Sequence, residues 1–181
     1  STSRGLGDVY KRQIQLESII KKVLEDKARF ERELRIRKQQ EALKTKSFKA
    51  LKGQLPWPAE GRIIAKFGRQ WNSKLKTTTE NPGIDIKGQP GSPIRTVLGG
   101  VVTTITYIRG YGTTIIVDHG GGFYTVYSHV TNIQTVVDGQ VRNGDIIAYM
   151  GDSGSINGSK LHFEIWGKGQ KLDPEKWLIK K

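Results

Sequence analysis

"KLHFEIW", residues 160–166, alternates apolar and polar side chains along most of its length. Successive side chains of a β-strand point to opposite faces of a sheet, so this period of two predicts a strand with one apolar and one polar face. The apolar face consists of Leu161, Phe163 and Ile165, and the polar face of Lys160, His162 and Glu164. Side chains two positions apart on a strand are separated by about 7 Å. We therefore expect Lys160 and His162 to lie side by side and to point the same way.

The chain before this strand has the same β character. Five stretches rich in Val, Ile, Thr, Tyr and Phe are separated by glycine-containing turns: "GRIIAKFG", "SPIRTVLGGVVTTITYI", "GTTIIVDHG", "GFYTVYSHV" and "DIIAYMG". Such spacing is typical of an antiparallel all-β domain. Residues 53–181 also hold all six Pro, all four Trp and 20 of the 22 Gly. The sequence predicts a mainly β domain over residues 53–181, large enough to fold alone, in which "GDSG" and "INGS" (151–154 and 156–159) form one loop.

A helical arm is expected before this domain. Apolar residues recur at helical spacing from Ile14 to about Leu51, with a coiled-coil pattern carried by Ile19, Val23, Phe30 and Leu34 and widened by Leu16, Ile20 and Leu24. A lone solvated helix is the alternative interpretation. Gly53 can cap the helix, and Pro56 and Pro58 cannot continue it. We place the arm at residues 13–52 and expect residues 1–12 to be a non-native or disordered segment.

The charge is strongly positive, with 30 Lys and Arg against 17 Asp and Glu and a net charge of +13. Such a chain favours anionic partners such as nucleic acid, acidic lipid or an anionic wall polymer, although a charge run can also be a solvated helix face. The absence of Cys excludes disulfides and Cys-ligated zinc. No apolar stretch is long enough to span a membrane, and the N-terminus lacks the apolar segment of a signal peptide.

Three His residues limit the possible metal chemistry. His119 precedes a glycine turn, and we interpret it as a turn histidine bonded to backbone. His129, His162 and Asp85 fall at strand ends or strand-adjacent positions, and a carboxylate with imidazoles is a ligand set that zinc accepts. Catalytic zinc needs three protein ligands and an open position for water. Spacing alone supplies two candidates and one neighbour, one ligand short of such a site.

Several motifs, taken together and in order, resemble the LytM or lysostaphin-type zinc metallopeptidase domain over about residues 55–181. They are "NPGIDIKGQPGSPIRTVLGGVV", "GTTIIVDHGGGFYTVYSHV", "VRNGDIIAYMGDSG" and "KLHFEIW". The resemblance implies a duplicated, barrel-sandwich type of β fold and a site built from H-x-x-x-D, Y-x-H and H-x-H patterns. It assigns Asp85 as the ligand carboxylate, His162 as a ligand imidazole and His129 as the catalytic histidine. Asn81 and Lys160 stand where the other two histidines belong.

These two departures bear on catalysis. The Asn81 side chain offers only a weak carbonyl ligand, and an ammonium group at Lys160 repels Zn²⁺. We expect weak or no zinc binding, no cofactor and no peptidase activity, with Asp85, His129 and His162 as remnants of the family site. Lys160 could instead pair with Asp85 and replace the missing metal charge. The alternative is a residual zinc metallopeptidase that uses Glu80 or Asn81 as an unusual third ligand.

A coiled-coil segment, a proline-marked linker and a degenerate LytM-like domain resemble the EnvC-type murein hydrolase activators. The resemblance implies a noncatalytic protein of the periplasm or cell envelope that binds and activates a peptidoglycan amidase during cell division, with its signal outside these 181 residues and no nucleic-acid partner. It implies a further partner, an FtsE/FtsX-type membrane complex, at the coiled coil. The expected binding groove consists of Asn81, Asp85, His129, Lys160 and His162. A peptidoglycan-binding module is another alternative, and Trp71 in the polar loop 68–80 is expected to be either a lid or, preferably, a packing residue.

Overall fold

The computed structural model describes residues 2–155 and 158–181, apart from the side chains of residues 2–4 and 40–46. Ser1 of the N-terminal segment and Ile156 and Asn157 of the predicted "INGS" loop lie outside these residues. The chain forms two compact units, residues 1–42 and 43–181.

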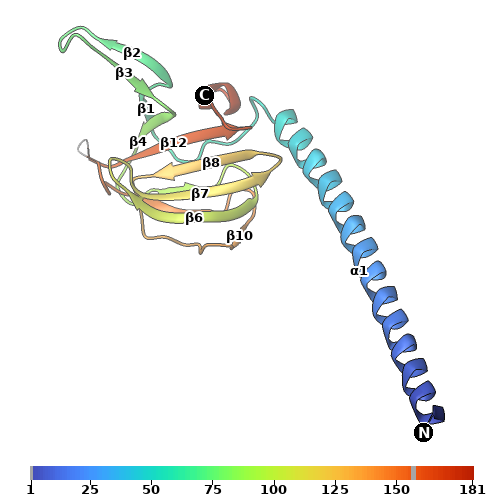
Figure 1. Cartoon of the computed structure of the whole chain (residues 1–181). Helices are drawn as coiled ribbons and strands as arrows, with labels where there is room; N and C mark the ends of the chain where they lie inside the picture. The colour runs from blue at the N-terminus through green and yellow to red at the C-terminus, as the bar shows by residue number, and fades with distance from the viewer. Residues whose placement is uncertain (1, 156–157) are drawn as a thin grey trace. The chain divides into compact units, whose positions relative to one another are not determined.

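The first unit is helical. Helix α1 (Thr2–Ala50) confirms the predicted arm, and Figure 1 shows it as one long ribbon. Residues 2–12 belong to this helix, and the assignment of residues 1–12 as a non-native or disordered segment stays a prediction. Gly5 and Gly7 each disfavour the helix by roughly 1 kcal/mol relative to Ala. The helix nevertheless continues through both positions. The apolar stripe of the arm, including Ile19, Val23 and Phe30, is exposed in the single chain.

The second unit is a β-domain, as predicted. Its main sheet has the strand order β1-β4-β12-β8-β7-β6-β10, with β13 paired to β12, and every strand pair is antiparallel (Figure 1). The strands of this sheet are β1 (Arg62–Ala65), β4 (Ile84–Lys87), β6 (Gly100–Ile108), β7 (Gly112–Gly120), β8 (Phe123–Ser128), β10 (Gln140–Val141), β12 (Lys160–Gly167) and β13 (Gln170–Leu172). A second sheet of β5 (Pro93–Arg95), β11 (Ile146–Met150) and β9 (Val130–Thr131) completes the domain with the short helix α2 (Pro174–Trp177).

Strand β12 has the two faces predicted from its alternation. Leu161, Phe163 and Ile165 are fully buried in the core. The central position of β12 between β4 and β8 explains this burial, because neighbours on both sides and the core beneath leave the apolar face no contact with water. The opposite, polar face presents Lys160 and His162 toward β4.

The last turn of α1 contributes to the β-domain core. The Phe48 ring stacks on Phe123 with 4.2 Å between ring centroids and lies 5.2 Å from the Trp177 ring. Only 1% of Phe48 is exposed. Gly53, with a φ of +80°, follows the helix and donates its N–H to the Trp177 carbonyl, which fits its predicted capping role. The core of the β-domain therefore includes a residue from before the predicted boundary at residue 53.

Residues 68–81 form a hairpin, not the predicted polar loop. Strands β2 (Gly68–Asn72) and β3 (Thr77–Asn81) pair antiparallel as a separate two-stranded sheet (Figure 1). The Asn72 side chain accepts hydrogen bonds from the Lys74 and Leu75 N–H groups and so fixes the turn. Trp71 is 64% exposed, so the preferred interpretation of it as a packing residue is wrong. Neither α1 nor α2, over the residues described, is apolar and long enough to span a membrane.

Candidate functional site

Two adjacent strands bring the remnant site together. In the register of β4 and β12, His162 lies opposite Asp85. Asp85 Oδ1 accepts a hydrogen bond from His162 Nδ1 at 2.6 Å, and Asp85 Oδ2 accepts one from Lys160 Nζ at 3.0 Å. The side chains of Lys160 and Asp85 are 12% and 13% exposed. The ion pair anticipated from the sequence is therefore formed at a site largely shielded from water.

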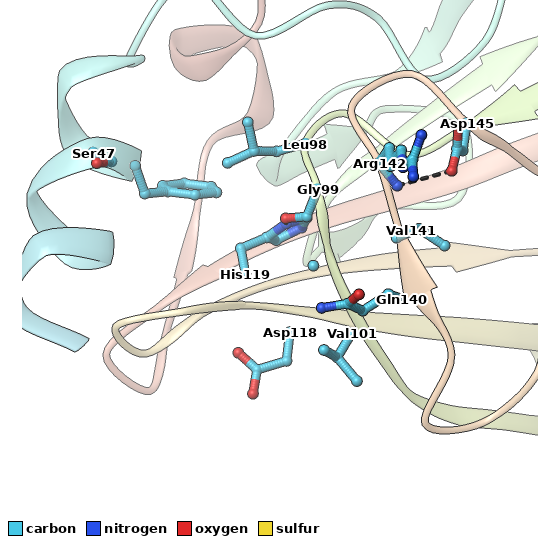
Figure 2. Close-up of a pocket in the computed structure, with 12 residues that line it drawn as sticks. Ser47, Leu98, Gly99, Val101, Asp118, His119, Gln140, Val141, Arg142 and Asp145 are labelled. Carbon is cyan, nitrogen blue, oxygen red and sulfur yellow. Dashed lines mark hydrogen bonds between the residues drawn. The ribbon is translucent and has the colours of Figure 1, made fainter. Parts of the chain in front are cut away.

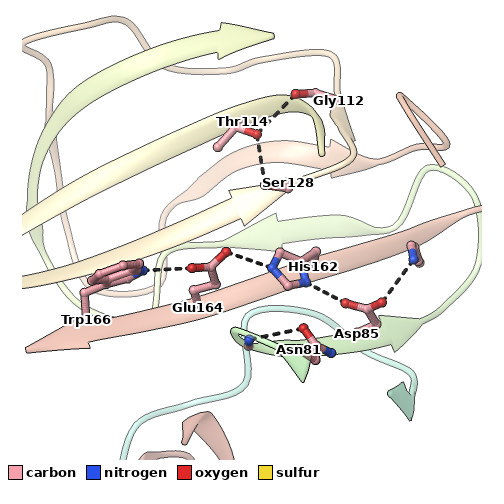
Figure 3. Close-up of polar contacts among 10 residues, drawn as sticks. Asn81, Asp85, Gly112, Thr114, Ser128, His162, Glu164 and Trp166 are labelled. Carbon is pink, nitrogen blue, oxygen red and sulfur yellow. Dashed lines mark hydrogen bonds and ion pairs between the residues drawn. The ribbon is translucent and has the colours of Figure 1, made fainter. Parts of the chain in front are cut away.

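The polar face of β12 extends this network beyond the predicted residues. His162 Nε2 donates to Glu164 Oε2 at 2.8 Å, and Trp166 Nε1 donates to Glu164 Oε1 at 2.8 Å. Figure 3 shows the unbroken line from Trp166 through Glu164 and His162 to Asp85. Sequence reasoning placed Glu164 on this face but gave it no role, and it missed Trp166. The period-two alternation places residues 160, 162, 164 and 166 on one face, but it does not predict the hydrogen bonds between them.

Alternating charges run through this network. Burial alone would lower the pKa of His162, but the hydrogen bonds and negative charges of Asp85 and Glu164 outweigh it and raise the pKa above the ordinary 6.5. Burial also favours the neutral form of Asp85, yet the hydrogen bonds and charges of His162 and then Lys160 lower its pKa below the ordinary 3.8. The charged forms of Asp85 and His162 are thus stabilised by each other and by their neighbours Lys160 and Glu164.

His129 lies close to this network without a hydrogen bond to it in the described chain. It stands between β8 and β9 with a φ of +63°, and its Nδ1 donates to the Ser153 carbonyl at 2.7 Å. Burial lowers its pKa, so the ring is held neutral. Tyr111 links the two parts, since its carbonyl accepts from the His129 N–H and its ring lies 5.2 Å from that of His162.

Asn81 and Glu80 do not complete a ligand set. Asn81 ends β3, and its Oδ1 accepts a hydrogen bond from the Gly83 N–H at 3.2 Å (Figure 3). The Asn81 side-chain oxygen is therefore engaged in a local hydrogen bond with the backbone. Glu80 lies opposite Arg69 in the hairpin and is exposed. Neither residue has a hydrogen bond to Asp85 or His162 among the contacts of the described residues.

These residues do not fit a zinc ion. Both oxygens of Asp85 and both ring nitrogens of His162 are engaged in hydrogen bonds within the protein, and the Lys160 ammonium lies 3.0 Å from Asp85 Oδ2, where its charge repels a cation. Within residues 2–155 and 158–181, no three His, Asp or Glu side chains form a group that could hold a metal ion. Zinc requires three protein ligands with free lone pairs, which this donor set does not offer.

His119 stands apart from the remnant site, as predicted. Its Nδ1 donates to the Gly99 carbonyl at 2.9 Å, and its Nε2 lies 2.7 Å from the Thr125 hydroxyl. Burial lowers its pKa. The ring forms part of the wall of a cleft of ≈ 590 Å³ that also includes Leu98 and Arg142 (Figure 2). Because both nitrogens are used within the fold, His119 has a structural role.

The fold and the remnant site together define a LytM-type β-domain whose metal-ligand set is incomplete. A model of Peptidase family M23 matches residues 79–174, more than half of the chain. The chain belongs to this family.

Several bacterial proteins are similar to this chain. The murein hydrolase activator EnvC of Escherichia coli strain K12 is 32% identical over 129 residues, which are 71% of this chain and 30% of that protein. The outer membrane antigenic lipoprotein B of Haemophilus influenzae is 38% identical over 123 residues, 67% of this chain and 28% of that protein. The chain thus spans less than a third of these relatives. A zinc-containing peptidase from Vibrio cholerae has the same fold, with a TM-score of 0.63 at 21% identity over 71% of this chain and 41% of the peptidase.

Proposed function

We propose that this protein is a noncatalytic activator of a peptidoglycan hydrolase, which it binds with its degenerate M23 site. The observation that carries the proposal is the Lys160–Asp85 ion pair at 3.0 Å, in the place where an active member needs a metal. Similarity to a murein hydrolase activator supports the same assignment. A peptidase would require zinc to activate water, and the donor set does not fit that ion.

The partner in this proposal is a cell-wall amidase that contacts the rim of the remnant site. Asn81, Asp85 and Lys160 are partly exposed, whereas His129 and His162 are buried. The first three would contact the partner, and the two histidines would hold the surface in shape. The protein would act in the periplasm or elsewhere in the cell envelope, and an FtsE/FtsX-type membrane complex would engage its helical arm.

Dye release from labelled sacculi tests this function. The protein alone should release no dye, and a purified cell-wall amidase should release more dye in its presence than without it. Asn81→Asp and Lys160→Glu should weaken the activation, because they change the charge of the proposed rim, while the exposed Tyr107→Ala on β6 should not. Chelator-sensitive dye release by the protein alone would instead establish a peptidase.

The β2–β3 hairpin favours a second candidate function, binding of peptidoglycan itself. Trp71 and Arg69 share one face of β2, and the hairpin is otherwise rich in neutral hydrogen-bonding side chains such as Gln70, Asn72 and Thr77. An exposed indole can stack on a sugar ring, and a nearby guanidinium can pair with a carboxylate. Only two large apolar side chains, Trp71 and Leu75, are exposed there, which suits a polar polymer.

Sedimentation with purified sacculi tests the second candidate. Trp71→Ala should reduce the bound fraction several-fold, and Trp71→Phe should retain part of it. Tyr107→Ala removes an aromatic side chain of similar exposure outside the hairpin and serves as the matched control. Equal losses for the Trp71 and Tyr107 variants would exclude the hairpin as the binding element.

A further inference from the structure

An apolar pocket lies at the end of β12 farthest from Lys160. It has a volume of ≈ 520 Å³. Its apolar lining comes from Phe123, Leu172 and Trp177, and the rings of Phe123 and Trp177 lie 5.9 Å apart. These residues come from β8, β13 and α2, three elements whose relative placement is fixed by the core. The pocket is thus a built feature of the β-domain and separate from the remnant site.

Three lysines surround this pocket without an acidic counterpart. Lys49, Lys52 and Lys168 line it and are exposed. No Asp or Glu is among its lining residues, and none of the ion pairs found in the described parts of the chain involves these lysines. Lys52 Nζ lies 5.5 Å from the centre of the Trp177 ring, so one ammonium group is held directly beside the apolar lining. Among the residues that line this pocket, the three positive charges therefore have no acidic counterpart.

We infer that this pocket binds an acidic peptide segment that presents one large apolar side chain. Phe123 and Trp177 expose only 3% and 7% of their surface, so the lining offers the edges of these rings together with the partly exposed Leu172 to one apolar side chain. The lysines offer three positive charges to the carboxylates beside it. A polyphosphate or nucleic-acid strand would use the lysines but leave the apolar lining unfilled. A flat bilayer would not enter a concave pocket. The inference does not depend on the proposed activator function.

Fluorescence anisotropy on the full chain tests this site with three labelled peptides. The probe has the sequence Glu-Glu-Leu-Trp-Glu-Glu with blocked ends, one control peptide replaces Leu and Trp by Ser, and the other replaces every Glu by Lys. The wild-type chain should bind the probe at least about tenfold more tightly than either control peptide, because each control removes one of the two contacts. Equal binding of the probe and the Ser peptide, or no binding of the probe, would overturn the inference.

A pair of charge-matched variants separates this pocket from the overall positive charge. Lys49→Glu with Lys52→Glu and Lys168→Glu should weaken probe binding by about tenfold or more. Lys66→Glu with Lys74→Glu and Lys76→Glu changes the net charge equally, at exposed lysines elsewhere, and should weaken it less than about threefold. Equal losses would assign binding to net charge and overturn the inference.

A folding control and a competing ligand complete the experiment. Circular dichroism melting should show that both triple variants stay folded. If the triple variant at the pocket melts at a lower temperature than the wild type, the single variant Lys168→Glu, in the exposed turn after β12, replaces it. It should then weaken probe binding by about threefold, and an unchanged affinity would count against the site. Phosphatidylglycerol vesicles serve as the competing occupant. If they bind the wild type through these lysines while the probe does not, the pocket is a lipid site and the inference fails.

Discussion

Lys160 brings a positive charge to Asp85 that a metal ion would otherwise supply, at a distance of 3.0 Å. Asp85 and His162 were recognisable in the sequence as family positions, and the electrostatic argument for Lys160 led to the pair that the structure contains. The Glu164–Trp166 extension was not reached, because alternation shows that residues share a face but not which polar atoms meet. The role of these residues as a partner-binding groove stays a prediction.

Removing the ammonium group should destabilise the β-domain. Lys160→Met keeps the aliphatic stem but leaves Asp85 with one charged partner fewer, and we expect a loss of about 1–3 kcal/mol in the free energy of unfolding. Urea denaturation measures this. Lys87→Met, opposite residue 160 on β4 and exposed, should change it by less than about 0.5 kcal/mol. The same effect in both variants would mean that the ion pair contributes nothing.

The stability contributed by His162 should fall as the pH rises. Its pKa in the folded chain is raised above 6.5, so its contribution is complete below that value and is lost as the pH passes through the folded-state pKa. The unfolding free energy of the wild type minus that of His162→Gln should therefore shrink as the pH rises above 6.5. His119 has a lowered pKa, so the same difference for His119→Gln should change in the opposite direction, shrinking as the pH falls below 6.5. A flat His162 difference would contradict the charged network.

Zinc binding should require two substitutions. In Asn81→His with Lys160→His the repelling ammonium is gone and two imidazoles are added to that of His162. We expect one zinc per chain by mass spectrometric metal analysis. The wild type and Asn81→His alone should take up no stoichiometric zinc, since Lys160 still engages Asp85 Oδ2. Tight zinc binding by the wild type would show that the geometric argument against the metal is wrong.

At the scale of elements, β12 was predictable and the hairpin was not. Alternation of apolar and polar residues gave the two faces of β12, because burial of one face is imposed by the sheet on either side. Residues 68–81 lack such alternation, so their pairing depends on the Asn72 turn and on the β-branched Thr77, Thr78 and Thr79. Nearly every side chain of the hairpin is exposed, so its sequence has no apolar pattern that would predict the two strands.

Deleting the hairpin should leave the domain folded. Joining Gly68 to Asn81, which are paired in register, through a two-residue turn removes mostly exposed side chains. We expect the free energy of unfolding to change by less than about 1 kcal/mol. Calorimetry or urea denaturation measures this, and a loss of several kcal/mol would reveal that the hairpin supports the core. Deletion should still abolish any contribution of Trp71 to sacculus binding.

For the whole molecule, the division into a helical arm and a β-domain followed from composition, since Pro, Trp and nearly all Gly lie in residues 53–181. The part played by Phe48 did not. A single aromatic at the end of a helical pattern gives no sign that it stacks on Phe123, which lies 75 positions later along the chain. Contacts between distant segments of this kind are set by the tertiary fold and have no local signature.

The length of the fragment should therefore decide the stability of the isolated β-domain. Residues 53–181 lack Phe48, and loss of a buried Phe costs roughly 3–5 kcal/mol. We expect the fragment 43–181 to melt at a higher temperature than 53–181, with Phe48→Ala in the longer fragment removing most of the difference. Lys49→Ala, at an exposed position, is the control. Equal melting of both fragments would show that Phe48 adds nothing to the core.

The closed network around Asp85 also bears on how such a protein could change over evolutionary time. With Lys160 in place, a new histidine at position 81 gains no metal. With Asn81 in place, loss of Lys160 only removes a charged partner from the half-buried Asp85 carboxylate. Each single substitution toward a complete zinc-ligand set is therefore neutral or harmful. Such a set can arise only when positions 81 and 160 change together, so single substitutions leave the present network in place.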